Sequence, residues 1–169
     1  MPPELDEQYI QKLMNNIRNN KNSPAFKKIK SAWYNANKRS VPAKMVSLMR
    51  KGTSPVAGHE FASYSDSYIN AIEKGRYSQY SKAKTPVNLK LSGDLHKSIV
   101  AEENESGFSV FTENPIAEYH QDGTDNMSAR KIFPEEGDSF HSSVSDLLDK
   151  SLRRISENVL FKLFGNRRI

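Results

Sequence analysis

The chain has 169 residues, of which 36% are hydrophobic and 27% are charged, and its formal net charge is +5. This length suits one domain that buries about 70% of its unfolded surface, so we expect a single domain over residues 1–169. The absence of cysteine excludes disulfides and thiolate metal sites. No apolar run approaches the ~20 residues of a membrane-spanning helix, and the first residues lack the pattern of a signal peptide. We therefore expect a soluble protein made in a cytoplasm, with no membrane partner.

Residues 1–51 are predicted to form a basic helical part. Apolar residues at helical spacing predict a first helix from Leu5 to Asn20. Ser23 offers an N-cap oxygen and Pro24 suits the first helical position, so a second helix should begin there. Pro42 should end or kink that helix, because its ring clashes with the carbonyl one turn earlier, and Ala43–Arg50 can continue as a short helix. The basic side chains that we predict at an interface here are Lys27, Lys28, Lys30, Lys38 and Arg39.

Residues 52–91 are predicted to form a long loop or arm that contains one helix, Ser65–Lys74, capped by Ser65. A connection of this length is uncommon in a compact domain unless it is functional or becomes ordered against a partner. We therefore expect an interface element that is mobile or extended in the free subunit. Its candidate interface residues Tyr64, Tyr77 and Tyr80 could stack on nucleic-acid bases, or could anchor the loop to its own domain or to a neighbour.

Residues 92–169 are predicted to hold the sheet. Ser92 should cap a short helix that begins at Gly93. Alternating side chains then predict a β-hairpin, with strands Ile99–Glu103 and Phe108–Thr112 and a turn at Asn104–Gly107.

A helical turn should follow from Pro115 to Gln121 and end at Gly123, and Met127–Phe133 is predicted to form a further strand. Apolar residues from Phe140 to Phe164 recur at spacings of three, four and seven, which predicts a long amphipathic helix that ends at Gly165. This helix should supply the main core, with four residues buried: Leu148, Leu152, Ile155 and Val159. The expected fold class is α+β, with a small, mainly antiparallel sheet packed against long N- and C-terminal helices.

The charges are segregated along the chain. The range Gln8–His59 contains eleven Lys or Arg residues and no Asp or Glu, whereas the range Glu102–Asp149 contains twelve Asp or Glu against only Arg130 and Lys131. Such opposition is typical of electrostatic matching between subunits or to a polyanion. Two helix faces with different solvation would give the same pattern, so both interpretations stay open.

No catalytic constellation is evident in the sequence. The four histidines fall in four separate segments, and none pairs with another at the spacing of a helical zinc site. His120 beside Glu118 and Asp122 could form a metal or acid–base cluster, but neighbouring helical residues point to different faces. A hydrogen-bonded turn histidine is the alternative. We expect no enzyme activity, no catalytic residue, no metal site and no cofactor.

Two short segments carry a recognisable pattern. The first has the form Ser/Thr-Gly-x-Leu-x-x-Ser-Ile and is matched by Ser92, Gly93, Leu95, Ser98 and Ile99. The second has the form Tyr-Ala-x-Tyr/Ile-His-x-x-Gly-Thr and is matched by Ala117, Tyr119, His120, Gly123 and Thr124. It runs into a Met/Ile-Pro-Ala-Arg-Pro-Phe motif, matched by Met127, Ala129 and Arg130. In this order the C-terminal half of the chain resembles the virion morphogenesis, or tail completion, proteins of tailed bacteriophages.

The match has departures. Ile116 replaces the usual Tyr, Asp122 occupies a position where an aromatic residue is common, and Ser128 and Lys131 replace the two prolines of the last motif. Arg130 is retained, and its planar fork could bind a carboxylate or backbone carbonyls. An ordinary exposed strand residue is the alternative at that position.

The resemblance implies a structural neck protein that assembles as a ring, commonly of six subunits, during virion assembly in the host bacterial cytoplasm. Its partners would be further copies of itself, the head-side connector or adaptor, and the tail tube or tail terminator. Double-stranded DNA would pass through the lumen without sequence-specific contact, so we expect acidic or neutral lumen residues and outward-facing basic helices. A basic nucleic-acid-binding protein is one alternative, and a phage-encoded hydrolase is another.

Overall fold

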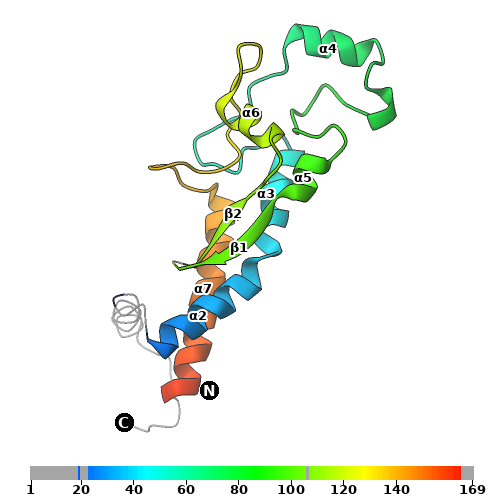
Figure 1. Cartoon of the computed structure of the whole chain (residues 1–169). Helices are drawn as coiled ribbons and strands as arrows, with labels where there is room; N and C mark the ends of the chain where they lie inside the picture. The colour runs from blue at the N-terminus through cyan, green and yellow to red at the C-terminus, as the bar shows by residue number, and fades with distance from the viewer. Residues whose placement is uncertain (1–18, 20–22, 106, 165–169) are drawn as a thin grey trace.

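The computed structural model describes residues 19, 23–105 and 107–164, and the fold is α+β (Figure 1). Apart from Asn19, the predicted helix Leu5–Asn20 lies outside these residues, as does the predicted helix end at Gly165. The single-domain organisation over residues 1–169 therefore stays a prediction. Within the described part, no helix is both long enough and apolar enough to cross a membrane.

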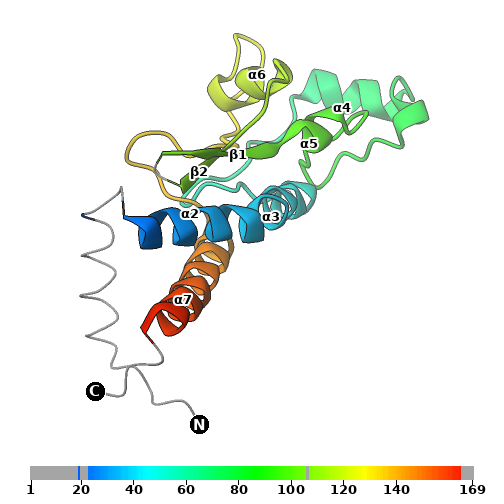
Figure 2. The same cartoon turned by 60° about the horizontal axis from the view of Figure 1, so that its bottom comes forward.

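Three helices form the frame of the molecule: α2 (Pro24–Asn37), α3 (Ser40–Arg50) and α7 (Ser142–Phe164). The predicted start of α2 is confirmed, because Pro24 is its first residue and the Ser23 hydroxyl accepts a hydrogen bond from the Phe26 amide at 3.1 Å. The helix α2 ends at Asn37, earlier than the end predicted at Pro42. That proline lies in the first turn of α3, where its missing N–H is tolerated. Figure 2 shows α2 crossing α7.

The main core is centred on α3. Val41, Met45 and Met49 have no exposed surface, and Ile132 and Val144 pack with them at 0% exposure. The spacing of the three α3 residues places them on one face of that helix, and other parts of the chain cover this face. The prediction that the terminal helix supplies the main core is therefore wrong.

The helix α7 contributes to two clusters instead. Its first turns add Val144 to the main core, and further along Ile155 and Val159 pack with Ile29 of α2 in a second cluster. Both of those α7 residues are buried as predicted, at 8% and 6% exposure. Leu148 and Leu152 are only half-buried, because α7 leaves the main core as it crosses α2.

The small sheet is the predicted hairpin. Strand β1 (Val100–Asn104) pairs antiparallel with β2 (Gly107–Phe111), within one residue of the expected bounds. The hairpin packs closely on α2: the rings of Trp33 and Phe108 lie 4.9 Å apart, and a Cβ on Gly107 would lie 2.8 Å from Trp33 Cζ3. The indole N–H of Trp33 donates to the Leu148 carbonyl of α7 at 3.2 Å. This one side chain therefore joins hairpin, α2 and α7.

The predicted strand Met127–Phe133 is wrong. Its backbone groups bond to a side chain in place of a neighbouring strand: Gln121 Oε1 on α6 (Ile116–Asp122) accepts from the amides of Ile132 at 2.9 Å and Phe133 at 3.1 Å. The Gln121 amide group also donates to the Phe133 carbonyl at 2.8 Å. With these groups occupied, the sheet in the described part of the chain has only two strands.

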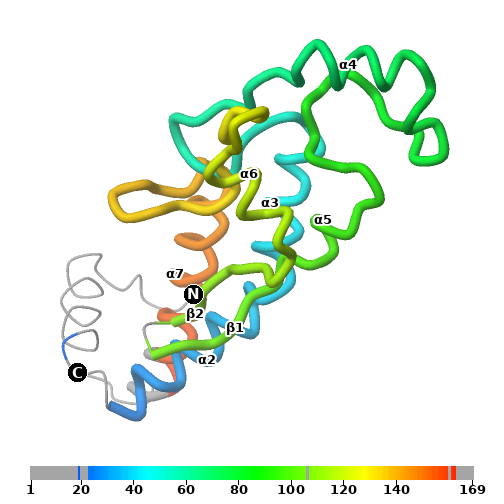
Figure 3. The backbone as a smooth tube through the Cα atoms, turned by 45° about the horizontal axis from the view of Figure 1, so that its top comes forward, coloured from blue at the N-terminus to red at the C-terminus, as the bar shows by residue number. Residues whose placement is uncertain are grey.

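The segment 52–91 divides into two parts. Its beginning belongs to the body, where Ser54 and Val56 are buried and Val56 forms a bridge with Phe140. Residues 63–86, which we call the arm, extend to the end of the molecule away from α2 (Figures 1 and 3). The arm holds α4 (Asp66–Glu73), which Ser65 caps as predicted, and a 3-10 turn at Ser78–Tyr80. No residue of α4 is buried.

Candidate functional site

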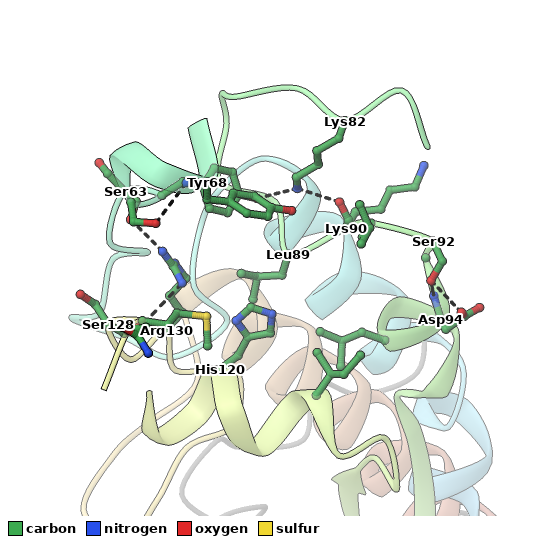
Figure 4. Close-up of a pocket in the computed structure, with 18 residues that line it drawn as sticks. Ser63, Tyr68, Lys82, Leu89, Lys90, Ser92, Asp94, His120, Ser128 and Arg130 are labelled. Carbon is green, nitrogen blue, oxygen red and sulfur yellow. Dashed lines mark hydrogen bonds between the residues drawn. The ribbon is translucent and has the colours of Figure 1, made fainter. Parts of the chain in front are cut away.

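A hollow of about 360 Å³ lies where the arm meets the body (Figure 4). The arm, the segment before the short helix α5 (Asp94–Ser98), α6 and the segment after α6 all contribute to its wall. Its lining includes Tyr64, Lys82, Lys90, Ile116, His120 and Arg130.

The hollow brings the two family-like segments together. Ser92, Gly93 and Leu95 line it from the first segment, and His120, Met127 and Arg130 line it from the second. The remaining motif residues lie outside the lining: Ser98, Ile99, Ala117, Tyr119, Gly123, Thr124 and Ala129. The two family-like segments thus form two sides of one structural module, which surrounds the hollow.

The first segment is built around α5. Gly93 precedes the helix with φ of 96°, and Leu95 is buried. The predicted Ser92 cap is one residue off, because Gly93 occupies the N-cap position and the Ser92 hydroxyl donates to Asp94 Oδ2 at 2.6 Å. At the end of α5, the Ser98 hydroxyl is 2.6 Å from Thr112 Oγ1. Ser98 therefore ties the helix to the hairpin.

The second segment folds back on itself at Gly123. This residue ends α6 with φ of 79°, and a Cβ at this position would lie 2.8 Å from both the Ala129 amide nitrogen and the Met127 carbonyl oxygen. Glycine is required both for the left-handed conformation and for the close backbone approach. The Thr124–Met127 bridge closes the turn, which returns the chain toward α6.

The other residues of this segment differ in burial. Ala117 is buried at 5% exposure, whereas Tyr119 is 55% exposed. The helix α6 is therefore buried on the side of Ala117 and leaves the ring of Tyr119 in solvent.

Arg130 fastens the arm to this turn. Its side chain is only 2% exposed, Nε donates to the Ala62 carbonyl at 2.8 Å, and Nη2 donates to the Ser63 carbonyl at 2.7 Å. Of the predicted roles, the fork on backbone carbonyls is confirmed and the exposed strand residue is wrong. The guanidinium carbon also lies 5.4 Å from the centroid of the Tyr64 ring, within the range of a cation–π contact.

Lys82 closes the arm from the other side. Its ammonium donates to Tyr64 Oη at 2.6 Å, Asn88 Oδ1 at 2.8 Å and the Lys90 carbonyl at 2.7 Å. All three donors therefore meet neutral oxygens. Burial, together with the nearby charges of Arg130 and Lys90, lowers the pKa of Lys82 to about 8. The lysine stays charged near neutral pH only at a cost in free energy.

His120 lies half-buried in the same wall. Burial, followed by the charges of Arg130 and Lys82, lowers its pKa to about 4. Its Nδ1 atom is buried and has no hydrogen-bond partner among the described residues. The alternative prediction, that His120 is hydrogen-bonded within a turn, is therefore wrong for this nitrogen. Its backbone carbonyl instead accepts from the Arg130 amide.

The predicted interface tyrosines occupy different places. Tyr64, Tyr68 and Tyr77 form a ladder with ring centroids 5.0 and 5.1 Å apart, which supports the arm from inside. Burial raises the pKa of Tyr64. Tyr80 is 41% exposed. Within this chain, Tyr64 and Tyr77 therefore anchor the arm, whereas the exposed Tyr80 is available to a partner.

Four of the predicted basic residues are exposed in or just after α2: Lys27 and Lys28 lie in the helix, and Lys38 and Arg39 follow its end. Lys30 is different, because it donates to the Asn104 carbonyl at 3.0 Å and so binds the turn end of the hairpin. The hollow does not include these residues, so the molecule has two separate basic regions.

A metal centre finds no support in the ranges that the structure describes, where no three His, Asp or Glu side chains gather as a possible ligand set. Glu118 and Asp122 are exposed and His120 faces the hollow. The three therefore form no cluster.

Sequence reasoning missed Lys82. It lies in a basic polar stretch without a motif, and only the folded arm brings it close to Tyr64 and Arg130. Comparisons with protein-family models, curated proteins and solved structures found no match to the chain.

Proposed function

We propose that this chain is a structural neck or tail completion protein of a tailed bacteriophage, which forms a ring, most simply a hexamer, between the head connector and the tail tube. The observation that carries the proposal is the meeting of the two family-like segments in one module, with Arg130 buried at its centre. A resemblance to a family motif is better supported when the motif residues lie together in the fold. The protein would act through its interfaces, without turnover or cofactor.

Exposed apolar side chains near this module support assembly. Leu91 is 37% exposed and Ile116 is 48% exposed, and both line the hollow, while Tyr119 on α6 is 55% exposed. Apolar groups gathered at a hollow mark interaction sites more often than scattered ones do. The arm also suits a neighbour as partner, since no residue of its helix α4 is fully buried within its own subunit.

The charge distribution supports head-to-tail contacts. In a ring, one patch of each subunit meets a different patch of the next. Exposed basic residues of α2 and exposed acidic residues of the hairpin and α6 are available in the described chain, and one basic–acidic pair between α2 and the hairpin, Lys30 with Glu103 at 3.8 Å, already forms within the subunit. Their complementarity would fix the register of neighbours more than it would add affinity.

Native mass spectrometry of the purified chain over a wide concentration range tests this proposal. We expect one closed oligomer of fixed stoichiometry. The variant Tyr119→Ser should weaken the oligomer, whereas Glu136→Gln, on an exposed loop, should leave it unchanged. A wild-type chain that stays monomeric at every concentration would contradict the proposal.

A basic nucleic-acid-binding protein is the second candidate. The observation that favours it is the exposure of Lys27 and Lys28 on α2 and of Arg39 just after it, since none of the three forms an ion pair within the described part of the chain. Phosphate binding by such a face would weaken steeply with salt. Tight duplex binding by the free subunit at physiological salt, lost in Lys27→Glu/Lys28→Glu, would favour this candidate over the ring.

A further inference from the structure

The hollow concentrates positive charge that its own chain does not neutralise. Lys82, Lys90 and Arg130 all line it, and none of them forms an ion pair with a carboxylate within the described residues. Asp94 is the acidic residue in the lining, but its carboxylate already accepts from Ser92 Oγ at 2.6 Å. Positive charge in a partly enclosed hollow attracts an anion more strongly than the same charge in open solvent.

The wall of the hollow is otherwise largely apolar. Leu89 and Leu95 are buried at its base, at 6% and 5% exposure. Leu91 and Ile116 are exposed at 37% and 48% and also line it. A ligand that fits both features carries one negative group beside an apolar group. An acidic side chain next to an aliphatic one in a protein segment has this chemistry.

A nucleic acid fits less well. A base would need a free aromatic face for stacking, but the Tyr64 ring contacts Lys82 Nζ at 4.7 Å from its centroid, Arg130 at 5.4 Å, and the Tyr68 ring at 5.0 Å. The three ammonium donors of Lys82 are also occupied by neutral oxygens. Lys90 remains, since its ammonium makes no hydrogen bond or ion pair in the described part of the chain.

The outer face of β1 offers a segment of the required kind. Residue Val100 is 44% exposed, and Glu102, two positions along the strand, is exposed on the same face. The opposite face turns toward α2, because Phe108, the cross-strand neighbour of Glu103, packs its ring on Trp33. Glu102 takes part in no ion pair among the residues that the structure describes.

We infer that the hollow is a docking site for a second copy of this chain, in which Lys90 receives the carboxylate of Glu102 and the exposed Leu91 and Ile116 cover the neighbouring Val100. The inference rests on the proposed ring and names one of its subunit contacts. Lys82 and Arg130 hold the walls in place and add to the attraction. Lys90 is the direct partner because its ammonium is free to donate.

A charge-swap experiment on the full chain tests this contact by sedimentation velocity over a concentration series. The variants are Lys90→Glu, Glu102→Lys and the double variant, and Lys150→Glu serves as a matched control at an exposed position of α7. Each single variant of the pair places like charges opposite each other, which should weaken self-association at least ~10-fold. The double variant should regain most of the loss, and the control should match the wild type.

The outcomes separate the contact from the ring. An oligomer that forms normally in Lys90→Glu, or single-variant defects that the double variant does not repair, would overturn the contact and leave the ring intact. A monomeric wild-type chain would overturn both. Binding of a single-stranded oligothymidine that Lys90→Glu abolishes would assign the hollow to phosphate and overturn the inference. Far-UV circular dichroism of each variant verifies that the substitution leaves the fold unchanged.

Discussion

The body and the arm of this molecule are stabilised in different ways. In the body, Met45, Met49 and Ile132 are fully buried among other apolar side chains. In the arm, α4 buries no residue, and the attachment depends on Arg130, Lys82 and a ladder of tyrosines. Apolar burial is cooperative across a core, whereas a few polar anchors can open locally. We therefore expect the arm to open more readily than the body.

The largest expected effect is in the body. Met45→Ala removes a side chain with 0% exposure from the main core, and should lower the free energy of unfolding by about 2–5 kcal/mol. The equivalent truncation in the arm, Ile72→Ala, removes a half-buried side chain and should cost less than about 1 kcal/mol. Urea denaturation measures both. Equal losses would mean that body and arm share one core.

The turn at Gly123 should show the next largest effect. Gly123→Ala combines a left-handed backbone with a clash against backbone atoms at 2.8 Å, and should cost about 2–4 kcal/mol. The matched control is Gly58→Ala, where φ is also positive, at 72°, but no atom lies within 4 Å of the added methyl. That control should cost only about 1–2 kcal/mol. Thermal unfolding measures the stability of both variants. Equal losses of stability would contradict a steric clash at Gly123.

Loss of the Arg130 fork should loosen the arm alone. Arg130→Lys keeps the charge but cannot bond to the Ala62 and Ser63 carbonyls together, and should cost about 1–3 kcal/mol of local stability. Hydrogen exchange should then quicken in residues 63–86 and stay unchanged in α3. Arg76→Lys is the control, because the Arg76 side chain is exposed and lies over the face of Tyr77 without a carbonyl fork. Unaltered exchange in the arm of Arg130→Lys would sink the idea that this residue anchors it.

The remaining expected effect is a dependence of stability on pH. The pKa of His120 is about 4 in the fold, against 6.5 for an ordinary histidine, so the unfolded chain takes up a proton first as the pH falls. Stability should therefore be lost between pH 6.5 and 4, with a slope of up to ~1.4 kcal/mol per pH unit. His120→Gln should flatten this slope in urea denaturation at several pH values. Part of it should remain, because burial also lowers the pKa of His96.

Local signals in the sequence predicted local structure well. The Ser23–Pro24 start of α2, the Ser65 cap of α4 and the hairpin all depend on residues close together in the chain, and all three are confirmed. The strand predicted at Met127–Phe133 failed because its backbone partners belong to the Gln121 side chain, which no local pattern reveals.

The candidate site was predicted only in part. The motif residues His120 and Arg130 were singled out, but not the hollow that they share with Lys82. The Arg130 bonds to Ala62 and Ser63 span 68 and 67 residues of sequence. Contacts over such separations arise from the folded arrangement of whole segments. No periodicity or spacing rule could have supplied them.

The central claim is that this chain is built to bind copies of itself in a closed ring. Native mass spectrometry of the wild-type chain beside Lys90→Glu tests it most directly. The account predicts a single closed oligomer for the wild type, which shifts toward monomer in Lys90→Glu and returns when Glu102→Lys is added. A wild-type chain that remains monomeric at the highest attainable concentration would contradict it.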